Sequence, residues 1–424
     1  MSSEARGATA SSTELPGYEQ AAAVVARRAA ELGLVLPAAE RVALGAAAGQ
    51  VLAQAVLADS DQPPFARSTR DGFACRAGEI SAHEFLLVAG ATRAGEVPGE
   101  PLPAGAVWEI MTGAPVPAGA DAVVMVEHVE AVDGRVRLLP PRTISARENI
   151  VTQGAQARTG DELLSVGAVI TYAQIALAAA CGHAELEVFR RPRVAILTTG
   201  DELVAVEAQP GAGQIRNSNA PMLAALVTAA GGEAWVLPTA ADDAKALDEA
   251  LAQAADADLL LISGGVSAGK FDLVEPALKR MGAHFHFTGV KIQPGKPLVF
   301  GELPRGPGGT IPFFGLPGNP VSSAVTFLLF ATPMLGALAG RRECGPRFAL
   351  AMLAEETRGK AGLTRFLPAY CDFGAAAGEP PQVRLVPWQG SGDLAALARS
   401  NCFLVIPEEA ASLPAGEMVR ILVA

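Results

Sequence analysis

From Arg193 onward, short apolar segments alternate with helical patterns, and this alternation constrains the fold more than any other feature of the sequence. Strands are predicted at 194–197, 234–237, 259–262, 284–287, 298–300 and 311–314. Helices are predicted at 220–230, 242–255 and 273–281, and a last one begins after residue 319. Strands that alternate with helices predict a doubly wound, mostly parallel sheet, which binds ligands outside the carboxyl ends of its strands.

Polar residues stand where the predicted helices begin. Asn219, Asp242 and Asn319 are expected to cap three helices, with Pro320 in the first position of the last one. The last helix is part of an uncharged stretch, and its residues 321–339 are long enough to span a bilayer. Its Ser, Thr and Pro residues and the strand pattern before it favour a buried helix of the α/β domain, and no membrane partner is expected.

The chain changes its pattern on either side of this region. Residues 18–32 predict a helix, and the alanine-rich segment 38–58 is expected to be helical in part. From 84 to 139, short apolar runs alternate with Gly/Pro turns, which predicts a small β domain. A helical stretch returns at 160–188, and strand-like runs after residue 346 predict a second β domain.

The composition fits a folded protein and excludes several functions. Of the 424 residues, 50% are hydrophobic and 18% charged, which excludes wholesale disorder. The net charge of -11 and the aromatic content of 5% argue against a nucleic-acid partner. The five cysteines form no C-x-x-C pair, which argues against a zinc site or a disulfide framework and fits a reducing compartment. No secretory signal is visible, so a cytoplasmic location is expected.

Three polar, glycine-rich loops follow predicted strands, at 198–202, 263–272 and 315–320. If the strands are parallel, these loops meet at one edge of the sheet, where glycines let backbone N–H groups approach a phosphate. Glycine-rich turns also occur without a function. Three together, two of them with acidic residues, favour an anion-binding site.

The second loop partly fits two catalytic motifs and completes neither. Gly264 to Lys270 fits G-x-x-x-x-G-K, but Phe271 stands where a P-loop has a Ser or Thr for Mg²⁺. The loop also fits G-x-S-x-G, although a serine hydrolase needs a later acid and histidine, and His284 and His286 follow too soon. A P-loop NTPase and a serine hydrolase are therefore the weaker alternatives.

Acidic residues gather in the same region, where they would repel an anionic substrate. A divalent cation between carboxylates and phosphate removes this conflict, and Mg²⁺ prefers oxygen ligands. Helix capping or solvation explains some of these acids equally well. Lys296 lies between two prolines and could present its charge to an oxyanion or be a solvated turn residue. The acids are Asp201, Glu202, Asp242, Asp243 and Asp272.

Seven segments occur in an order that resembles the molybdopterin molybdenumtransferases, the family of bacterial MoeA and of the E domain of gephyrin. Each segment alone is weakly specific, whereas all seven in this order are highly specific, and they cover nearly the whole chain after residue 15. They are AGQVLA (48–53), PPFARSTRDGFA (63–74), IMTGAP (110–115), TGDEL (199–203), SGGVSAGKFD (263–272), PGKP (294–297) and GLPGNPVS (315–322).

The resemblance implies a multidomain α/β plus β fold, as an elongated four-domain chain that forms a homodimer. The expected parts are a disordered tail (1–14), a discontinuous helical domain (15–58 and 146–190), an inserted small β domain (59–145), a doubly wound molybdopterin-binding α/β domain (191–340) and a C-terminal β-barrel-like domain (341–424). It also implies the activity: adenylyl-molybdopterin and molybdate give molybdenum cofactor and AMP, the last step of cofactor biosynthesis. Transient contact with a molybdopterin adenylyltransferase would supply the substrate.

The resemblance further assigns roles to residues of this sequence. Catalytic roles fall on Asp71, Thr112, Glu202, Asp242 and Asp272. Mg²⁺ would be held by Asp201, Glu202, Asp242 and Asp272. Substrate would be bound by Thr199, Gly200, Asn219, Ser263, Gly264, Gly265, Ser267, Pro317, Gly318, Asn319 and Pro320. Molybdate would be bound by Lys296, Pro297, Arg365 and Ser391. Asp71 and Thr112 would reach the cleft from the partner subunit.

The sequence departs from the family pattern at three places. Arg70 stands where a Met usually precedes the Asp-Gly pair, Gln156 ends the segment that is Gly-Glu-Asp in many members, and Gln293 replaces a Lys. Two alternatives therefore accompany the insertase: a molybdopterin adenylyltransferase and a non-catalytic carrier or scaffold. The roughly 190 residues before Arg193 argue against the adenylyltransferase, and the retained acids argue against the carrier.

Overall fold

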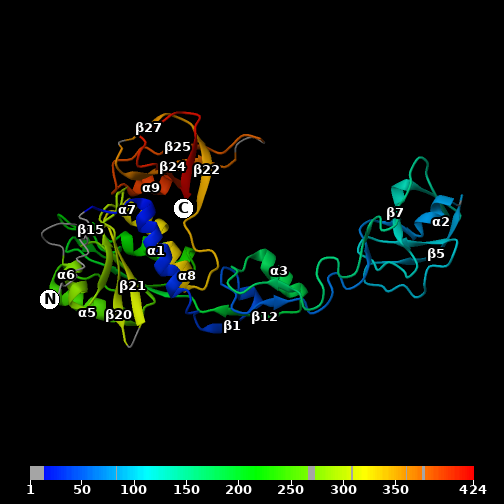
Figure 1. The fold of residues 1–424 in the computed structure, drawn as a ribbon, viewed down its shortest axis with the longest axis horizontal. Coiled ribbons are helices and arrows are strands. Elements are labelled where there is room, and N and C mark those ends of the chain that lie inside the picture. Colours follow the sequence, from blue (N-terminus) through cyan, green and yellow to red (C-terminus); the bar gives the residue numbers. More distant parts are fainter. Residues whose placement is uncertain (1–13, 83, 266–272, 307–308, 360, 375–377) are drawn as a thin grey trace, which may run out of the picture.

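The molecule is elongated, with a different part of the chain at each end (Figure 1). The structure, a computed structural model, describes residues 14–424 except 83, 266–272, 307–308, 360 and 375–377. The α/β region and the C-terminal strands lie together at one end, a small β sheet lies at the other, and a narrow middle region joins them. The tail predicted for 1–14 lies almost entirely outside the described residues.

The α/β region is built on a six-stranded sheet with the order β16–β13–β17–β21–β20–β18. The first four strands are parallel to one another, and β20 and β18 complete the sheet through antiparallel pairs. This confirms the predicted sheet. In that order, the strands are Glu233–Val236, Arg193–Thr198, Leu259–Ser263, Gly309–Leu316, Val299–Arg305 and His284–Thr288.

Alternate residues of the central strands point into two different cores. Val194 and Leu259 belong to one core, and Ala195 and Leu260 belong to the other. Helices pack against both faces, as a doubly wound fold requires. The first core takes up α1 (Tyr18–Leu32), α4 (Asn219–Ala229), α7 (Pro320–Thr326) and α8 (Thr332–Leu338), and the second takes up α5 (Ala244–Gln253) and α6 (Val274–Arg280).

The predicted buried helix after residue 319 is confirmed. Helix α7, a π-helical turn at Phe327–Ala331 and α8 form one run, with Pro320 in its first turn. This run is long and apolar enough to cross a membrane, but 83% of its most apolar window is buried inside the structure. It packs between the sheet and α1, as a core helix does.

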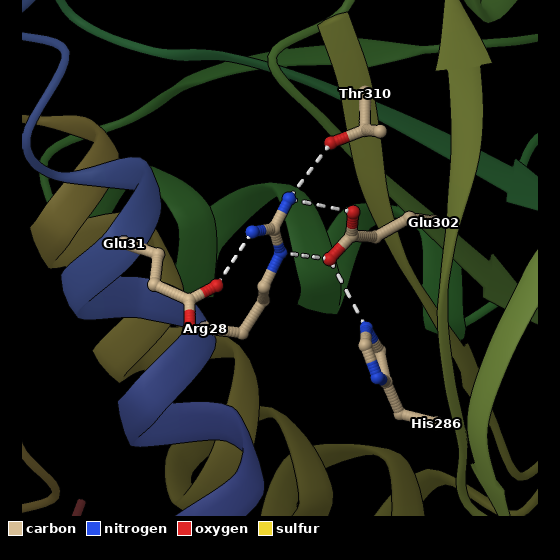
Figure 2. Close-up of polar contacts among 5 residues, drawn as sticks. All are labelled: Arg28, Glu31, His286, Glu302 and Thr310. Carbon is tan, nitrogen blue, oxygen red and sulfur yellow. Dashed lines mark hydrogen bonds and ion pairs between the residues drawn. The ribbon is translucent and has the colours of Figure 1, made fainter.

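Helix α1 has the predicted bounds and packs on the α/β region. Tyr18, Ala21, Val25 and Ala29 are buried at helical spacing and join the core that contains α8. Polar contacts also join it to strands of the sheet (Figure 2). There Arg28 donates to both carboxylate oxygens of Glu302 on β20, with Nη2 2.8 Å from Oε2.

The middle region contains less helix than the sequence predicts. Within 38–58 the structure has the strands β1 (Ala39–Ala43) and β2 (Val56–Leu57) and a single 3₁₀ turn at Leu44–Ala46. Its strands pair with β12 (Glu185–Phe189) and β11 (Glu162–Leu164), while α3 (Tyr172–Ala180) supplies the helix. Pairing with residues more than 100 positions away therefore overrides the helical propensity of the alanines.

The inserted β domain is a six-stranded sheet with the order β7–β4–β6–β5–β9–β8 and one short helix, α2 (Ala77–Ala82). Two connecting segments lead into it and pair with each other as β3 (Arg67–Ser68) and β10 (Ile150–Val151). In chain order, its strands are Gly72–Cys75, Leu86–Thr92, Ala106–Ile110, Ala122–Met125, Val129–Val132 and Arg135–Leu138.

The C-terminal strands close into a barrel. The order β24–β25–β22–β28–β26 is closed by a further pairing of β24 with β26, which confirms the expected barrel-like domain. A short strand of the α/β region, β19 (Ile292–Gln293), pairs with β24 and joins the two domains. The barrel strands are β22 (Phe348–Leu353), β24 (Thr364–Asp372), β25 (Gln382–Leu385), β26 (Cys402–Ile406) and β28 (Met418–Val423).

Candidate functional site

The three glycine-rich loops meet at the carboxyl ends of the parallel strands. The N–H of Thr199, after β13, donates to the carbonyl of Ser263 at the end of β17 over 3.1 Å. The N–H of Gly264 donates to the carbonyl of Leu316 at the end of β21 over 3.3 Å. The topology thus brings together the described parts of all three loops, as the sequence predicts.

Glycine is required where these loops approach each other. Gly264 has a φ of +97°, and a Cβ there would lie 2.6 Å from the carbonyl oxygen of Thr199. Gly200 has a φ of +145°, and a Cβ there would lie 2.5 Å from the carboxylate of Glu202. The missing side chains therefore let the loops pack against one another and let Glu202 fold over the backbone.

Two buried oxygen atoms at this edge have no hydrogen-bond partner among the described residues: Thr199 Oγ1 and Asn219 Oδ1. The Asn219 amide is oriented by its other end, because Nδ2 donates to Ser263 Oγ over 2.9 Å and to the carbonyl of Gly318 over 2.7 Å. An unpaired buried acceptor is costly, so a donor from a bound molecule fits this position.

Asn219 does not cap α4, contrary to the prediction. It is the first residue of the helix, and Asn217 Oδ1 instead accepts from the N–H of Ala220 over 3.1 Å. The Asn219 side chain is engaged with Ser263 and Gly318 across the sheet edge, so it is not available to its own helix.

The acids of the β13 and β16 loops lie together. Asp201 Oδ1 accepts from the backbone N–H of Asp242 over 3.0 Å. Burial, and next the charges of Asp201 and Glu202, raise the pKa of Asp242 above its usual value. A hydrogen bond from the backbone N–H of Asp201 to the Asp242 carboxylate partly offsets this rise.

The predicted cap of α5 is also wrong by one residue. Asp243, not Asp242, is the N-cap, and its Oδ1 accepts from the N–H of Lys245 over 2.8 Å and of Ala246 over 3.2 Å. Capping therefore explains Asp243 and leaves the carboxylate of Asp242 without that role.

The predicted magnesium site lies partly outside the described residues. Asp272 and the substrate residue Ser267 lie outside the described residues, as does most of the loop that fits the P-loop and hydrolase motifs. Over the described part of the chain, no three His, Cys, Asp or Glu side chains form a group that could hold a metal ion. Asp201, Glu202 and Asp242 carry the oxygen atoms that Mg²⁺ prefers as ligands, but the three side chains do not form such a group by themselves.

A cavity of about 490 Å³ lies beside these loops, between the α/β region and the barrel. Asn319 borders both, and its Nδ2 donates to Ser391 Oγ over 2.8 Å. Asn319 is the N-cap residue of α7 but makes no side-chain cap, contrary to expectation, and its side chain is oriented toward Ser391 instead. The polar and proline lining includes Gln293, Lys296, Pro297, Pro317, Asn319, Ser322 and Ser391.

Arg365 lies next to this cavity on β24. It is paired in register with Gln293, and its buried Nε has no hydrogen-bond partner among the described residues. A buried guanidinium nitrogen without an acceptor fits a bound anion. The four residues predicted for molybdate therefore lie at one junction, with Lys296, Pro297 and Ser391 on the cavity wall.

Asp71 and Thr112 form a pair of their own. The N–H and the hydroxyl of Thr112 donate to Asp71 Oδ1 over 2.6 and 2.7 Å. They adjoin β4 and β6 of the inserted β domain, which lies at the opposite end of the molecule from the α/β region (Figure 1). Within one chain, the structure does not bring them to the other predicted residues.

Sequence reasoning missed some residues of the site. Asn217 is 8% exposed and holds Thr198 and Thr239 through its amide, and Trp388 lines the cavity at the barrel. The sequence did contain a signal for Asn217, because asparagine is favoured at helix starts and two asparagines, two positions apart, stand before this helix. None pointed to Trp388.

The comparisons with known proteins cover the same regions. Family models match in series: the MoeA N-terminal region (domains I and II) at 17–182, the probable molybdopterin-binding domain at 195–337 and the MoeA C-terminal region (domain IV) at 351–424. The molybdopterin molybdenumtransferase of Haemophilus influenzae is 33% identical over 90% of this chain and 93% of its own length. That of a Nostoc species is 34% identical, over 90% of this chain and 88% of its own length.

Solved structures agree with these matches. The molybdopterin biosynthesis MoeA protein of Pyrococcus horikoshii OT3 is 28% identical, with a TM-score of 0.79 over 97% of this chain and 100% of that chain. The likeness therefore extends from the first helix through the inserted β domain to the barrel. The chain belongs to the molybdopterin molybdenumtransferase family.

Proposed function

We propose that this chain is a molybdenum insertase, which converts adenylyl-molybdopterin and molybdate to molybdenum cofactor and AMP. The family supports this activity, because relatives that match 90% of this chain are named molybdopterin molybdenumtransferase. One structural observation carries it: Asn319 joins the strand-end loops to the cavity of Lys296 and Ser391. A phosphate site and an oxyanion site thus share one border.

The strand-end loops suit the phosphate of the pterin substrate. The Thr199 hydroxyl can donate a hydrogen bond to a phosphate oxygen, and Asn219 Oδ1 can accept one from an N–H or O–H group elsewhere on the substrate. Close approach of the backbone is possible at Gly264 and Gly318, where no side chain intervenes. These residues would bind and orient adenylyl-molybdopterin.

The cavity suits molybdate. Lys296 supplies a positive charge, Ser391 a hydroxyl and Arg365 the guanidinium nitrogen that lacks an acceptor. Gln293, which stands where the family pattern has Lys, can donate a hydrogen bond but supplies no net charge. Cleavage of a phosphoanhydride beside molybdate concentrates negative charge, which these fixed donors and cations would offset.

We include Mg²⁺ in the proposed reaction because carboxylates gather where an anionic substrate would bind. Asp201, Glu202 and Asp242 would hold it, together with Asp272, and it would neutralise phosphate charge when bound. The raised pKa of Asp242 supports this role, since burial and then the charges of Asp201 and Glu202 disfavour its carboxylate, which a cation there would stabilise.

A homodimer completes the proposed site. Asp71 and Thr112 would face the cleft of the partner subunit, since they lie far from the α/β loops of their own chain. We expect the dimer in the cytoplasm, where a reducing environment suits the five unpaired cysteines. An adenylylating enzyme must supply the substrate, and transient contact with it would serve that transfer.

Two alternatives make different predictions. The adenylyltransferase is not favoured, because the family match includes the inserted β domain and the barrel. A carrier would bind the substrate without cleaving it.

The decisive assay mixes purified chain, adenylyl-molybdopterin and Mg²⁺ and follows AMP release with and without molybdate. The insertase predicts release that depends on molybdate. It also predicts a large loss in Asp242→Asn, which conserves volume, and near-normal activity in Asp243→Asn, the neighbouring cap residue. Tight binding without AMP release would establish the carrier instead.

A further inference from the structure

Side-chain hydrogen bonds from one short segment reach the ends of all four parallel strands. This segment is residues 217–219, at the start of α4. Asn217 Nδ2 donates to Thr198 Oγ1, at the end of β13, over 2.8 Å and to Thr239 Oγ1, beyond β16, over 3.2 Å. Asn219 makes the corresponding bonds to the loops after β17 and β21. The two asparagines thus span the strand order β16–β13–β17–β21.

The two asparagines hold different halves of the site. The loops joined by Asn217 carry Asp201, Glu202 and Asp242, the acidic half. The loops joined by Asn219 carry the glycines and Ser263, the half that suits a phosphate. Their positions two residues apart on one segment fix each half relative to the other.

Asn217 uses its side-chain amide and its backbone N–H on neighbours within the fold. Both amide hydrogens are used on the threonines, Oδ1 accepts from the N–H of Ala220 over 3.1 Å, and its own N–H donates to the carbonyl of Val204 over 2.9 Å. Thr198 Oγ1 also lies 3.2 Å from Thr239 Oγ1, which closes the network. With 8% exposure, Asn217 acts from beneath the site rather than on its surface.

We propose that Asn217 is a positioning residue for molybdenum insertion, which holds Glu202 and Asp242 in register with the phosphate-binding loops. This inference rests on the proposed function. Because a displacement of about 1 Å can reduce a rate by about 100-fold, loss of the network should lower kcat by roughly 10- to 100-fold. The loops that suit the phosphate keep their contacts with Asn219, so binding of adenylyl-molybdopterin should change little. Its KM should stay within about threefold of the value for the original chain.

Two substitutions separate positioning from helix capping. Asn217→Ser keeps an oxygen that can cap α4 but is too short to reach both threonines. Asn217→Asp keeps the cap and can accept from both threonine hydroxyls, which rotate to donate. The serine variant should lose kcat, and the aspartate variant should restore it to within about threefold of the original chain.

The experiment measures kcat and KM for molybdate-dependent AMP release in the full-length chain and both variants, with unfolding midpoints to confirm that all are folded. Amide hydrogen exchange without substrate reports the loops at 200–204 and 240–243. It should be faster in the serine variant and normal in the aspartate variant.

Three other outcomes would contradict the inference or the proposed function. A fully active serine variant would reduce Asn217 to a cap, and an aspartate variant as impaired as the serine one would refute the hydrogen-bond network. If the unaltered chain releases no AMP, the proposed function fails. In that case the amide hydrogen exchange is the remaining test of the inference, and loop exchange that is unchanged in the serine variant refutes it.

Discussion

Thr112 donates two hydrogen bonds to one carboxylate oxygen of Asp71, so substitution of Thr112 alone tests this pair. The N–H of Thr112, and second its hydroxyl, lower the pKa of Asp71. Because the folded-state pKa is depressed, the pair stabilises the fold above the usual Asp pKa. This stabilisation is lost as pH falls through the lowered value.

Replacing Thr112 by Val removes the hydroxyl and keeps the N–H. The pKa of Asp71 should therefore rise part of the way to its usual value, while Thr112→Ser should leave it low. A carboxyl titration by NMR measures both. An unchanged pKa in the valine variant would mean that the hydroxyl bond is absent in solution.

Asp242 has the opposite shift, and this predicts a pH dependence. Its pKa is raised by burial and then by Asp201 and Glu202, so its charge is lost at a higher pH than usual as the solution is acidified. In the absence of Mg²⁺, the carboxyl of Asp242 should therefore titrate above the usual Asp pKa. Glu202→Gln removes one repelling charge, and in Mg²⁺-free pH titration by NMR it should move the pKa of Asp242 down. A pKa that stays or rises would contradict the predicted repulsion.

Side chains show where sequence reasoning stops at this scale. The types of residue at the strand ends were predictable, because glycines and acids in strand–loop–helix patterns have known uses. The predicted capping roles of Asn219, Asp242 and Asn319 were wrong, since each residue has a partner or neighbour that is remote in sequence.

At the scale of elements, α1 shows how a helix from the N-terminal segment becomes part of a distant domain. Arg28 joins it to Glu302, whose side chain is 7% exposed and also contacts His286 over 3.1 Å (Figure 2). Nη1 of Arg28 also contacts the carboxylate of Glu31 over 2.6 Å, and the Glu31 side chain is half exposed.

Arg28→Ala should lower the free energy of unfolding by about 3 kcal/mol, because it leaves the carboxylate of Glu302 buried without its cation. Glu31→Ala is the matched control and should cost less than about 1 kcal/mol, as exposed ion pairs do. Urea unfolding measures both. Equal losses in the two variants would show that Glu302 is not stabilised by Arg28.

Helices and strands were predictable to different degrees. Helix α1 has the bounds read from its apolar spacing, because its buried face is local in sequence. The segment 38–58 was misjudged, since β1 forms by pairing with β12 about 150 residues later. An alanine-rich sequence carries no sign of such a distant partner.

At the scale of the whole molecule, the elongated shape places the inserted β domain far from the α/β loops of the same chain (Figure 1). If a dimer brings Asp71 to the partner's loops, two inactive variants should complement each other. In mixed dimers of Asp71→Asn with Asp242→Asn chains, one of the two sites is intact.

Co-expression of these two variants should therefore restore about a quarter of the activity, since about half of the dimers are mixed and each has one working site. The assay compares the mixture with each variant alone. No recovery in dimers shown to be mixed would mean that Asp71 does not act in trans.

The central claim is that molybdate insertion and AMP release are one coupled reaction in this chain. The most direct measurement titrates molybdate at fixed adenylyl-molybdopterin and counts released AMP and molybdenum bound in the product. We predict equal amounts of the two at every molybdate concentration. AMP released at full rate without molybdate, or substrate bound without AMP release, would contradict the claim.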